Sequence, residues 1–198
     1  MNEKVNEVTK KNPYTVWFVV LSFVAPVILA YLVFFFGSVS SFTNKGEILN
    51  PIVDISALKL KDETNSLIPK KTLTYKWRLI SFVGSDCDTA CNSRLYDVRQ
   101  IHKSLGKDQH RVLRMIVHLQ APSDDLNKLI ESEYPNALNF YGDEKTITAA
   151  LGETSKIKEN EIYIMDPMGN IMMRFTQEQP NRDFQKDLRK LLKASQIG

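Results

Sequence analysis

Residues 77–91 read WRLISFVGSDCDTAC, and this stretch decides the fold of the chain. Its first part, 77–83, is apolar and rich in β-prone residues, which predicts a buried strand. The next three residues, 84–86, are turn formers. A helix is expected after the turn, because apolar residues then recur at helical spacing at Leu95, Val98, Ile101 and Leu105.

The only two cysteines of the chain, Cys87 and Cys91, lie where this helix is expected to begin. The unpaired N–H groups and the dipole of a helix N-terminus favour the thiolate form of a cysteine. Two cysteines are too few for a disulfide scaffold. The pair therefore indicates a redox site or a metal site.

Length and composition limit the class of protein. The 198 residues are 43% hydrophobic and 25% charged, with a formal net charge of +3. This length suits one membrane segment followed by one domain of about 150 residues. The basic residues are dispersed along the sequence, so we expect no nucleic-acid partner.

The N-terminal part of the sequence predicts a membrane anchor. Residues 14–36 form an apolar run without a charged residue, long enough to span a bilayer as a single transmembrane helix. The alternative is a cleaved signal peptide, but the run is long for the apolar part of such a signal. We expect residues 1–13 to be a cytoplasmic N-terminus, 37–50 a polar tether, and 51–198 a folded domain.

Lysines precede the apolar run and only Lys45 follows it closely, which favours export of the domain. The expected location is the cell inner membrane, single-pass, with the C-terminal domain in the periplasm. In a eukaryote, the same topology indicates the mitochondrial inner membrane. In an oxidising compartment the cysteines pair with each other unless they are kept reduced or bound to metal.

Strand and helix patterns alternate through the domain. Expected strands are 77–83, 111–119, 138–141, 161–165 and 171–175; expected helices follow the first three and close the chain at 183–194. An edge strand or hairpin arm is also expected within 53–60. Strand–helix–strand crossovers predict parallel pairing with helices on both faces, and the closing hairpin adds antiparallel strands at one edge. The predicted fold class is therefore α/β and thioredoxin-like, with a mixed central sheet flanked by helices.

Four motifs carry a resemblance to a known family. They are the strand, turn and Cys-x-x-x-Cys unit, LYDVRQ at 95–100, PSDD at 122–125 and YIMDPMGN at 163–170. With the N-terminal anchor and the thioredoxin-like domain, the sequence resembles the Sco/SenC family of copper chaperones of cytochrome c oxidase assembly.

The resemblance implies a membrane-anchored protein that assists assembly of a respiratory cytochrome c oxidase. It also implies Cu(I) binding by two cysteines and a distant histidine, and by position Cys87 and Cys91 match the two thiolate ligands. The loop where the family carries its histidine corresponds to 152–160, which contains none, so this is a divergent member. The implied partners are a cytochrome c oxidase subunit or another copper chaperone.

His118 is the candidate for a third metal ligand. It lies near the C-terminal end of the strand predicted over 111–119, and in an α/β sheet this edge is also the one that carries Cys87. Thiolates are soft ligands that suit Cu(I). The remaining side chains with nitrogen or sulfur donors are expected to pack or face solvent: His102, His110 and the hairpin methionines Met165, Met168, Met172 and Met173.

Two other functions remain open at this point. The first is thiol–disulfide exchange on exported proteins, with Cys87 and Cys91 as the catalytic redox pair. Asp86 and Asp88 disfavour a thiolate by their charge, and Asp86 is expected to cap the helix. The second is a non-catalytic assembly factor whose cysteines form a structural disulfide.

Overall fold

The computed structural model describes residues 13–36, 44–152, 157 and 160–197. The chain divides into two compact units, Met1–Thr43 and Asn44–Gly198. The described residues of the first unit form the helix α1 (Pro13–Phe36), which matches the helix predicted over 14–36. Residues 1–12 and 37–43 lie outside the described residues, and with them most of the predicted cytoplasmic N-terminus and half of the predicted tether.

The predicted membrane span is not confirmed. Within the described part of the chain, no helix qualifies as long and apolar enough to cross a bilayer.

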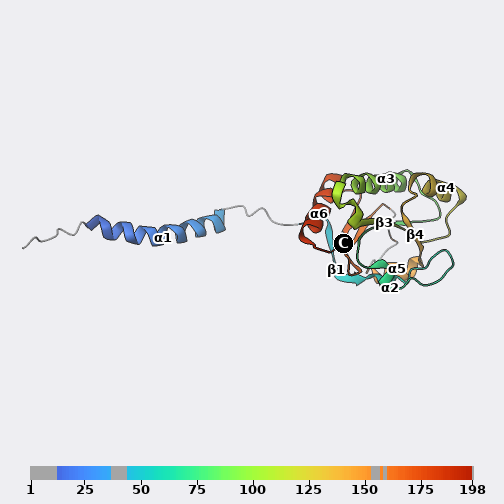
Figure 1. Cartoon of the computed structure of the whole chain (residues 1–198), viewed down its shortest axis with the longest axis horizontal. Coiled ribbons are helices and arrows are strands. Elements are labelled where there is room, and N and C mark those ends of the chain that lie inside the picture. Colours follow the sequence, from blue (N-terminus) through green and yellow to red (C-terminus); the bar gives the residue numbers. More distant parts are fainter. Residues whose placement is uncertain (1–12, 37–43, 153–156, 158–159, 198) are drawn as a thin grey trace, which may run out of the picture. The chain divides into compact units, whose positions relative to one another are not determined.

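The second unit is built on a six-stranded sheet with the strand order β1-β6-β5-β2-β3-β4 (Figure 1). The strands are β1 (Glu47–Asp54), β2 (Trp77–Val83), β3 (Val112–His118), β4 (Leu138–Tyr141), β5 (Ile162–Met165) and β6 (Asn170–Phe175). The neighbours β2, β3 and β4 run parallel, whereas β5, β6 and β1 are added antiparallel. The predicted mixed sheet with an antiparallel edge is confirmed.

Helices cover both faces of this sheet. They are α2 (Lys70–Leu73), α3 (Thr89–Ser104), α4 (Asp124–Glu133), α5 (Glu144–Ala150) and α6 (Asn181–Ala194), with short 3₁₀ helices η1 (Ile55–Leu58) and η2 (Gly106–Arg111). In Figure 1, α3 and α4 lie along one side of the sheet and α2 and α5 along the other. This is the layered arrangement expected of an α/β domain.

Alternation along β2 fills a core on each face. Ile80 and Phe82 pack with Ile147 of α5 on one face. Leu79 packs on the other face with Ile101 of α3 and Leu188 of α6. Because successive side chains of a strand point to opposite faces, a strand that is buried at every position, as β2 is, has to be covered on both sides.

The first strand differs from the expectation. The strand lies at Glu47–Asp54, upstream of most of the predicted 53–60, and pairs antiparallel with β6 at the edge of the sheet. It ends where the Asp54 carboxylate accepts a hydrogen bond from the Ser56 amide at 2.9 Å and starts the 3₁₀ turn η1. The last four residues of the predicted tether, 47–50, therefore belong to the sheet.

The parallel register of β2 and β3 defines the edge where a site is expected. Val83 ends β2 directly opposite His118, which ends β3. Beyond the strands, the Leu119 amide donates to the Val83 carbonyl at 2.8 Å, and the Ser123 amide donates to the Ser85 carbonyl at 2.8 Å. The loop that carries Cys87 is thus tied to the loop that follows β3.

Candidate functional site

The two cysteines form a disulfide at the N-terminus of α3. Cys87 lies in the loop after β2 and Cys91 in the first turn of the helix, with Cα atoms 5.2 Å apart. Cys91 is buried, with 1% of its surface exposed, whereas Cys87 is half-buried. The two sulfurs therefore differ in their access to a partner, which is what a redox pair needs if one sulfur attacks and the other resolves.

Asp88 caps the helix that carries the disulfide. Its carboxylate accepts a hydrogen bond from the Cys91 amide at 2.8 Å, and its carbonyl accepts one from the Asn92 amide at 2.9 Å. The prediction that Asp86 caps this helix is wrong. Asp86 precedes the loop cysteine and is exposed, and within the described ranges its carboxylate accepts only from the hydroxyl of Ser85. Asp88 could have been found in the sequence as the polar residue directly before the helix, three positions ahead of Cys91.

The cap changes the electrostatics of the pair. A helix N-terminus stabilises a thiolate through its free N–H groups and its dipole. Here the Asp88 carboxylate already occupies the amide of Cys91 and adds a negative charge close to the sulfurs. Both effects oppose a thiolate, so the arrangement favours the disulfide over the ionised dithiol.

A cavity of about 560 Å³ opens beside the disulfide. Its walls include the loop residues Ser85 and Asp86, the buried Cys91, and Gln120 from the loop after β3. Among the described residues that line it, the charged side chains are those of Asp86 and Asp88, and none is basic. Gln120 was not singled out from the sequence, because nothing in its local pattern signals that the loop after β3 turns toward the cysteines.

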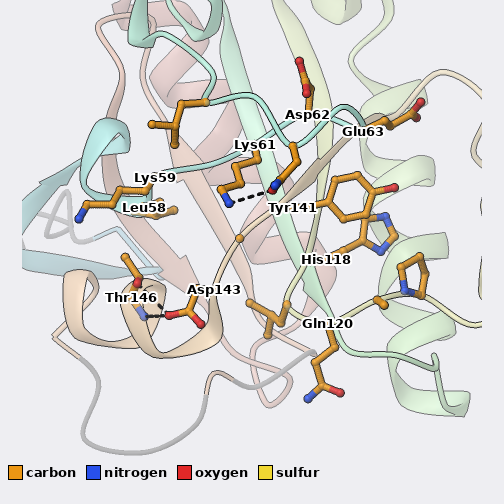
Figure 2. A pocket seen from close by; sticks show the side chains of 16 residues that line it. Leu58, Lys59, Lys61, Asp62, Glu63, His118, Gln120, Tyr141, Asp143 and Thr146 are labelled. Atoms are coloured by element: carbon orange, nitrogen blue, oxygen red, sulfur yellow. Dashed lines mark hydrogen bonds between the residues drawn. The ribbon is translucent and has the colours of Figure 1, made fainter.

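His118 is buried at the same edge of the sheet. It is 2% exposed, and its ring stacks on that of Tyr141 with centroids 5.0 Å apart (Figure 2). Its Nε2 lies 3.4 Å from the amide oxygen of Asn139, while its Nδ1 has no hydrogen-bond partner among the described residues. Burial lowers the pKa of His118, and the weaker effect of Asn139 raises it, so the ring is held in its neutral form.

A second cavity, of about 710 Å³, has His118 in its wall. Figure 2 shows Tyr141 beside the segment that carries Lys61, Asp62 and Glu63, and backbone hydrogen bonds join Lys61 to Tyr141. Gln120 also lines this cavity. The two cavities therefore share one wall, formed by the loop after β3.

The predicted metal ligands do not form a metal site in this state. Cys87 and Cys91 are bonded to each other, and no group of three or more histidine, cysteine or acidic residues in the described ranges is placed to hold a metal ion. His118 is brought to the cysteine edge of the sheet, as predicted. Its role as a ligand of the reduced pair stays a prediction.

The other candidate donors are engaged elsewhere. His102 donates from Nε2 to the carbonyl of Val112 at 2.8 Å, and His110 contacts the carbonyl of Lys107 at 2.8 Å through Nδ1. Both lie at the opposite end of β3 from the disulfide. Met165 and Met173 are fully buried in the two cores, which fits the packing role expected for them, whereas Met168 is exposed and does not pack in a core.

Comparisons with known proteins agree with this fold. The family model described as transmembrane-like, thioredoxin-like, C-terminal domain matches residues 77–195. Among curated proteins, no sequence matches the chain significantly.

Several solved structures share the architecture. BsSco, described with a disulfide switch and as a member of the Sco family of cytochrome c oxidase assembly proteins, gives a TM-score of 0.54 at 14% identity, covering 73% of this chain and 96% of BsSco. Copper-bound yeast Sco1 gives 0.54 at 16% identity, covering 73% of this chain and 88% of Sco1. The dsbF protein of MTB, in mixed oxidised and reduced forms, gives 0.50 at 16% identity, covering 69% of this chain and 97% of dsbF. At these identities the likeness shows the fold, and the predicted thioredoxin-like fold is confirmed.

Proposed function

This chain belongs to the family of transmembrane-like, thioredoxin-like C-terminal domains, and on that premise we propose that it exchanges thiols and disulfides with a partner protein. The observation that carries the proposal is the Cys87–Cys91 disulfide at the N-terminus of α3, with one cysteine half-buried and the other buried. A structural disulfide needs no such difference in access. A redox pair uses it to direct the partner to one sulfur.

The exchange starts from the reduced pair. The thiolate of Cys87 attacks a disulfide of the partner, forms a mixed disulfide with one partner sulfur and releases the other as a thiolate. The thiolate of Cys91 then attacks the Cys87 sulfur, which re-forms the Cys87–Cys91 disulfide and releases the second partner thiolate. The partner gains two electrons, and a dithiol reductant is needed to recharge the pair.

The acidic surroundings of the pair favour this direction. Asp86 and Asp88 disfavour the ionised dithiol, so they stabilise the disulfide relative to the reduced state. A pair whose disulfide is stabilised is a stronger reductant when it is reduced. The proposed role is therefore to keep cysteines of a partner reduced.

A trapping experiment tests the proposal. The full-length protein, reduced, is mixed with a disulfide-bearing peptide, and the covalent adducts are followed by mass spectrometry. We expect Cys91→Ser to accumulate a mixed disulfide through Cys87, because the resolving thiol is missing. Cys87→Ser, which removes one thiol from the same pair, is the matched control and should trap little. Equal trapping by both variants, or no exchange by the native protein, would contradict the proposal.

A second candidate function is Cu(I) binding by the reduced pair. Two observations favour it: the cysteines supply two soft donors next to each other, and the buried Nδ1 of His118 has no partner among the described residues. Cys87 and Cys91 would hold the ion, with His118 as the third donor. The fold shared with copper-bound yeast Sco1 supports this candidate at the level of architecture.

Copper binding is tested by competition. The reduced full-length protein is titrated with Cu(I) against a chelator of known affinity. We expect one ion per chain, lost in the double cysteine-to-serine variant and weakened in His118→Ala. His110→Ala, which removes an exposed imidazole, is the control and should leave the affinity unchanged. Failure of the native protein to compete with the chelator would remove this candidate.

The proposed setting is a membrane where a respiratory oxidase is assembled. It rests on the apolar sequence of residues 14–36 and on the fold shared with BsSco, a member of a family of cytochrome c oxidase assembly proteins. The proposed partner is an oxidase subunit or another copper chaperone outside the cytoplasm. Membrane attachment predicts that the protein resists alkaline extraction from membranes, whereas a Val24→Lys, Val27→Lys variant is released. Extraction of the native protein would contradict attachment.

A further inference from the structure

A basic cavity lies at the end of the sheet opposite the disulfide. It has a volume of about 550 Å³ and is bordered by the start of β3, the second half of α3, η2 and the loop after α4. Twelve described residues line it, none of them acidic, and five are lysine or arginine: Lys76, Arg99, Lys103, Lys107 and Arg114. A concave surface with one sign of charge concentrates ligands of the opposite sign.

Arg114 is the unusual residue of this cavity. It is 8% exposed, its Nε is buried without a hydrogen-bond partner, and within the described residues no ion pair or hydrogen bond reaches its guanidinium. The domain's other two buried arginines, Arg78 and Arg94, each also have one buried nitrogen without a partner, but both guanidinium groups are held by backbone carbonyls. Arg78 donates to Leu73 and Thr72, and Arg94 donates to Phe175 and Thr176.

A buried guanidinium without a partner is costly, because it has lost water and gained nothing in its place. A second cation increases the cost. Burial lowers the pKa of Arg114, and the positive charge of Arg99 lowers it further. An arginine nevertheless stays charged under these conditions. The structure therefore holds two neighbouring positive charges beside a cavity, and for one of them the described part of the chain supplies no counter-charge.

The acidic residues nearby do not neutralise the cavity. Glu133 accepts from Arg99 Nη1 at 2.8 Å, and Asp108 accepts from Arg111, but neither acid lines the cavity. Arg99 keeps its Nε buried and without a partner. The Nη groups of Arg114, which have no bond among the described residues, are thus available to a ligand that supplies several acceptor oxygens.

We propose that this basic cavity binds the phosphate group of a small ligand, with the buried Arg114 and the half-buried Arg99 as its arginines and Lys103 and Lys107 at the rim. The planar guanidinium fork matches two oxygens of a phosphate and forms charge-assisted hydrogen bonds with them. The cavity is larger than a phosphate ion, which leaves room for an organic part of the ligand.

The site is separate from the redox pair. Strand β3 has seven residues, Val112–His118, so its two ends lie about 20 Å apart. Arg114 stands near the first end and His118 at the second. The proposal therefore does not depend on the chemistry of the cysteines.

Calorimetric titration of the full-length protein, kept in a nonionic detergent at low salt, tests this site. The probes are inorganic phosphate, glycerol 3-phosphate and the short-chain lipid dihexanoyl phosphatidylglycerol. We expect saturable binding that weakens as salt is added, because the contacts are ionic. Arg114→Gln removes the charge-assisted hydrogen bonds of one guanidinium, and this should weaken binding about tenfold or more.

Two further variants keep the result interpretable. Arg182→Gln removes the same charge from an exposed position on α6 outside the cavity, and binding should be unchanged. If Arg114→Gln does not fold, the double rim variant Lys103→Gln, Lys107→Gln replaces it. Both side chains are exposed, so the variant should fold, and it should weaken binding because both line the cavity.

The outcomes separate the sources of the phosphate. Tighter binding of glycerol 3-phosphate than of the lipid assigns a soluble phosphate ester, and the reverse assigns a lipid headgroup; both results support the site. Absence of binding of all three probes overturns the proposal. Equal affinities in the native protein, Arg114→Gln and the rim variant would overturn it as well.

Discussion

A single carboxylate governs the electrostatics of the disulfide. Asp88 accepts from the Cys91 amide and places its negative charge beside both sulfurs. In Asp88→Asn a capping side chain remains while the charge is removed, so the thiolates of the reduced form are stabilised. We expect the reduction potential to rise by about 5–20 mV, which corresponds to the 0.3–1 kcal/mol typical of a charge at a helix end.

The potential is measured by equilibrating the protein with dithiothreitol mixtures and alkylating the free thiols. Asp125→Asn is the matched control, because Asp125 lies in the first turn of α4, a helix that contains no cysteine. It should leave the potential unchanged. A potential that is the same in Asp88→Asn and in the native protein would contradict the electrostatic role given to Asp88.

The buried imidazole of His118 predicts a pH dependence of stability. Burial lowers its pKa in the folded state below the value of about 6.5 in an unfolded chain. The unfolded chain therefore binds the extra proton first, and stability falls as the pH drops from 6.5 toward the folded pKa, by at most about 1.4 kcal/mol per pH unit. Above 6.5 the contribution of the neutral ring is fully present.

The comparison that isolates this effect is urea unfolding of the native protein and His118→Gln at pH 7.5 and pH 5.5. The stability difference between the two proteins should shrink at the lower pH. His102, whose pKa burial also lowers, is present in both and cancels. His110→Gln, at an exposed position, should keep a constant difference from the native protein. If the stability difference between the native protein and His118→Gln is the same at both pH values, the lowered pKa assigned to His118 is wrong.

Site residues that belong to a local sequence pattern can be predicted from the sequence, whereas site residues that matter because they are buried cannot. Cys87 and Cys91 are predictable as a site because the sequence itself shows their spacing and the start of the helix that follows them. Arg114 carries no such signal, because a strand that alternates polar and apolar residues reads the same whether its polar face meets water or a helix. Only the packing of α3 and α4 over β3 shows that Arg114 is buried.

At the level of elements, the edge strand β1 depends on a contact from the far end of the chain. The carboxylate of Asp187 in α6 is fully buried and accepts hydrogen bonds from the amides of Lys45 and Gly46, just before β1. Gly46 has no room for a side chain, because a Cβ would lie 2.5 Å from the ring of Phe175 in β6. The start of β1 is thus fixed between β6 and α6.

Removal of this carboxylate should loosen β1. In Asp187→Ala two amides lose their acceptor, and we expect the free energy of unfolding to fall by about 1–3 kcal/mol. Amide hydrogen exchange of β1 should accelerate more than that of β2. Asp183→Ala, in the first turn of the same helix, is the control and should change both quantities little. Unchanged exchange in β1 would contradict the role of Asp187.

The difference between local and long-range contacts explains which elements the sequence could predict. The strands from 77 onward and the final helix agree with the expected bounds within two residues, because each has its own apolar period and its own turn or cap. β1 was placed too far downstream, since Glu47 and Ile48 become a strand only by pairing with Arg174 and Met173 of β6. A pairing partner more than a hundred residues away leaves no local pattern.

At the scale of the whole molecule, the disulfide contributes little to keeping the domain folded. It joins residues only four positions apart, and a ring of this size removes about 2 kcal/mol of conformational entropy from the unfolded chain. A domain of this length typically has about 5–15 kcal/mol of stability. We therefore expect the reduced protein to stay folded and to lose about 2 kcal/mol.

Urea unfolding of the oxidised and the phosphine-reduced protein measures this difference. The double variant Cys87→Ser, Cys91→Ser is the control, because its stability should not respond to the reductant. Loss of the near-ultraviolet circular dichroism of the native protein on reduction would show that the disulfide is needed for the fold. The pair would then be structural, and the proposed exchange would fail with it.

The small ring between Cys87 and Cys91 also couples redox strength to folding through a thermodynamic cycle. The free energy by which the disulfide stabilises the folded chain equals the free energy by which folding stabilises the disulfide relative to the dithiol. About 2 kcal/mol in one leg of the cycle equals about 40 mV in the other for a transfer of two electrons. A copy of the chain that has lost its fold is therefore a weaker electron donor than its folded neighbour, so the fold itself supplies part of the driving force for reducing a partner.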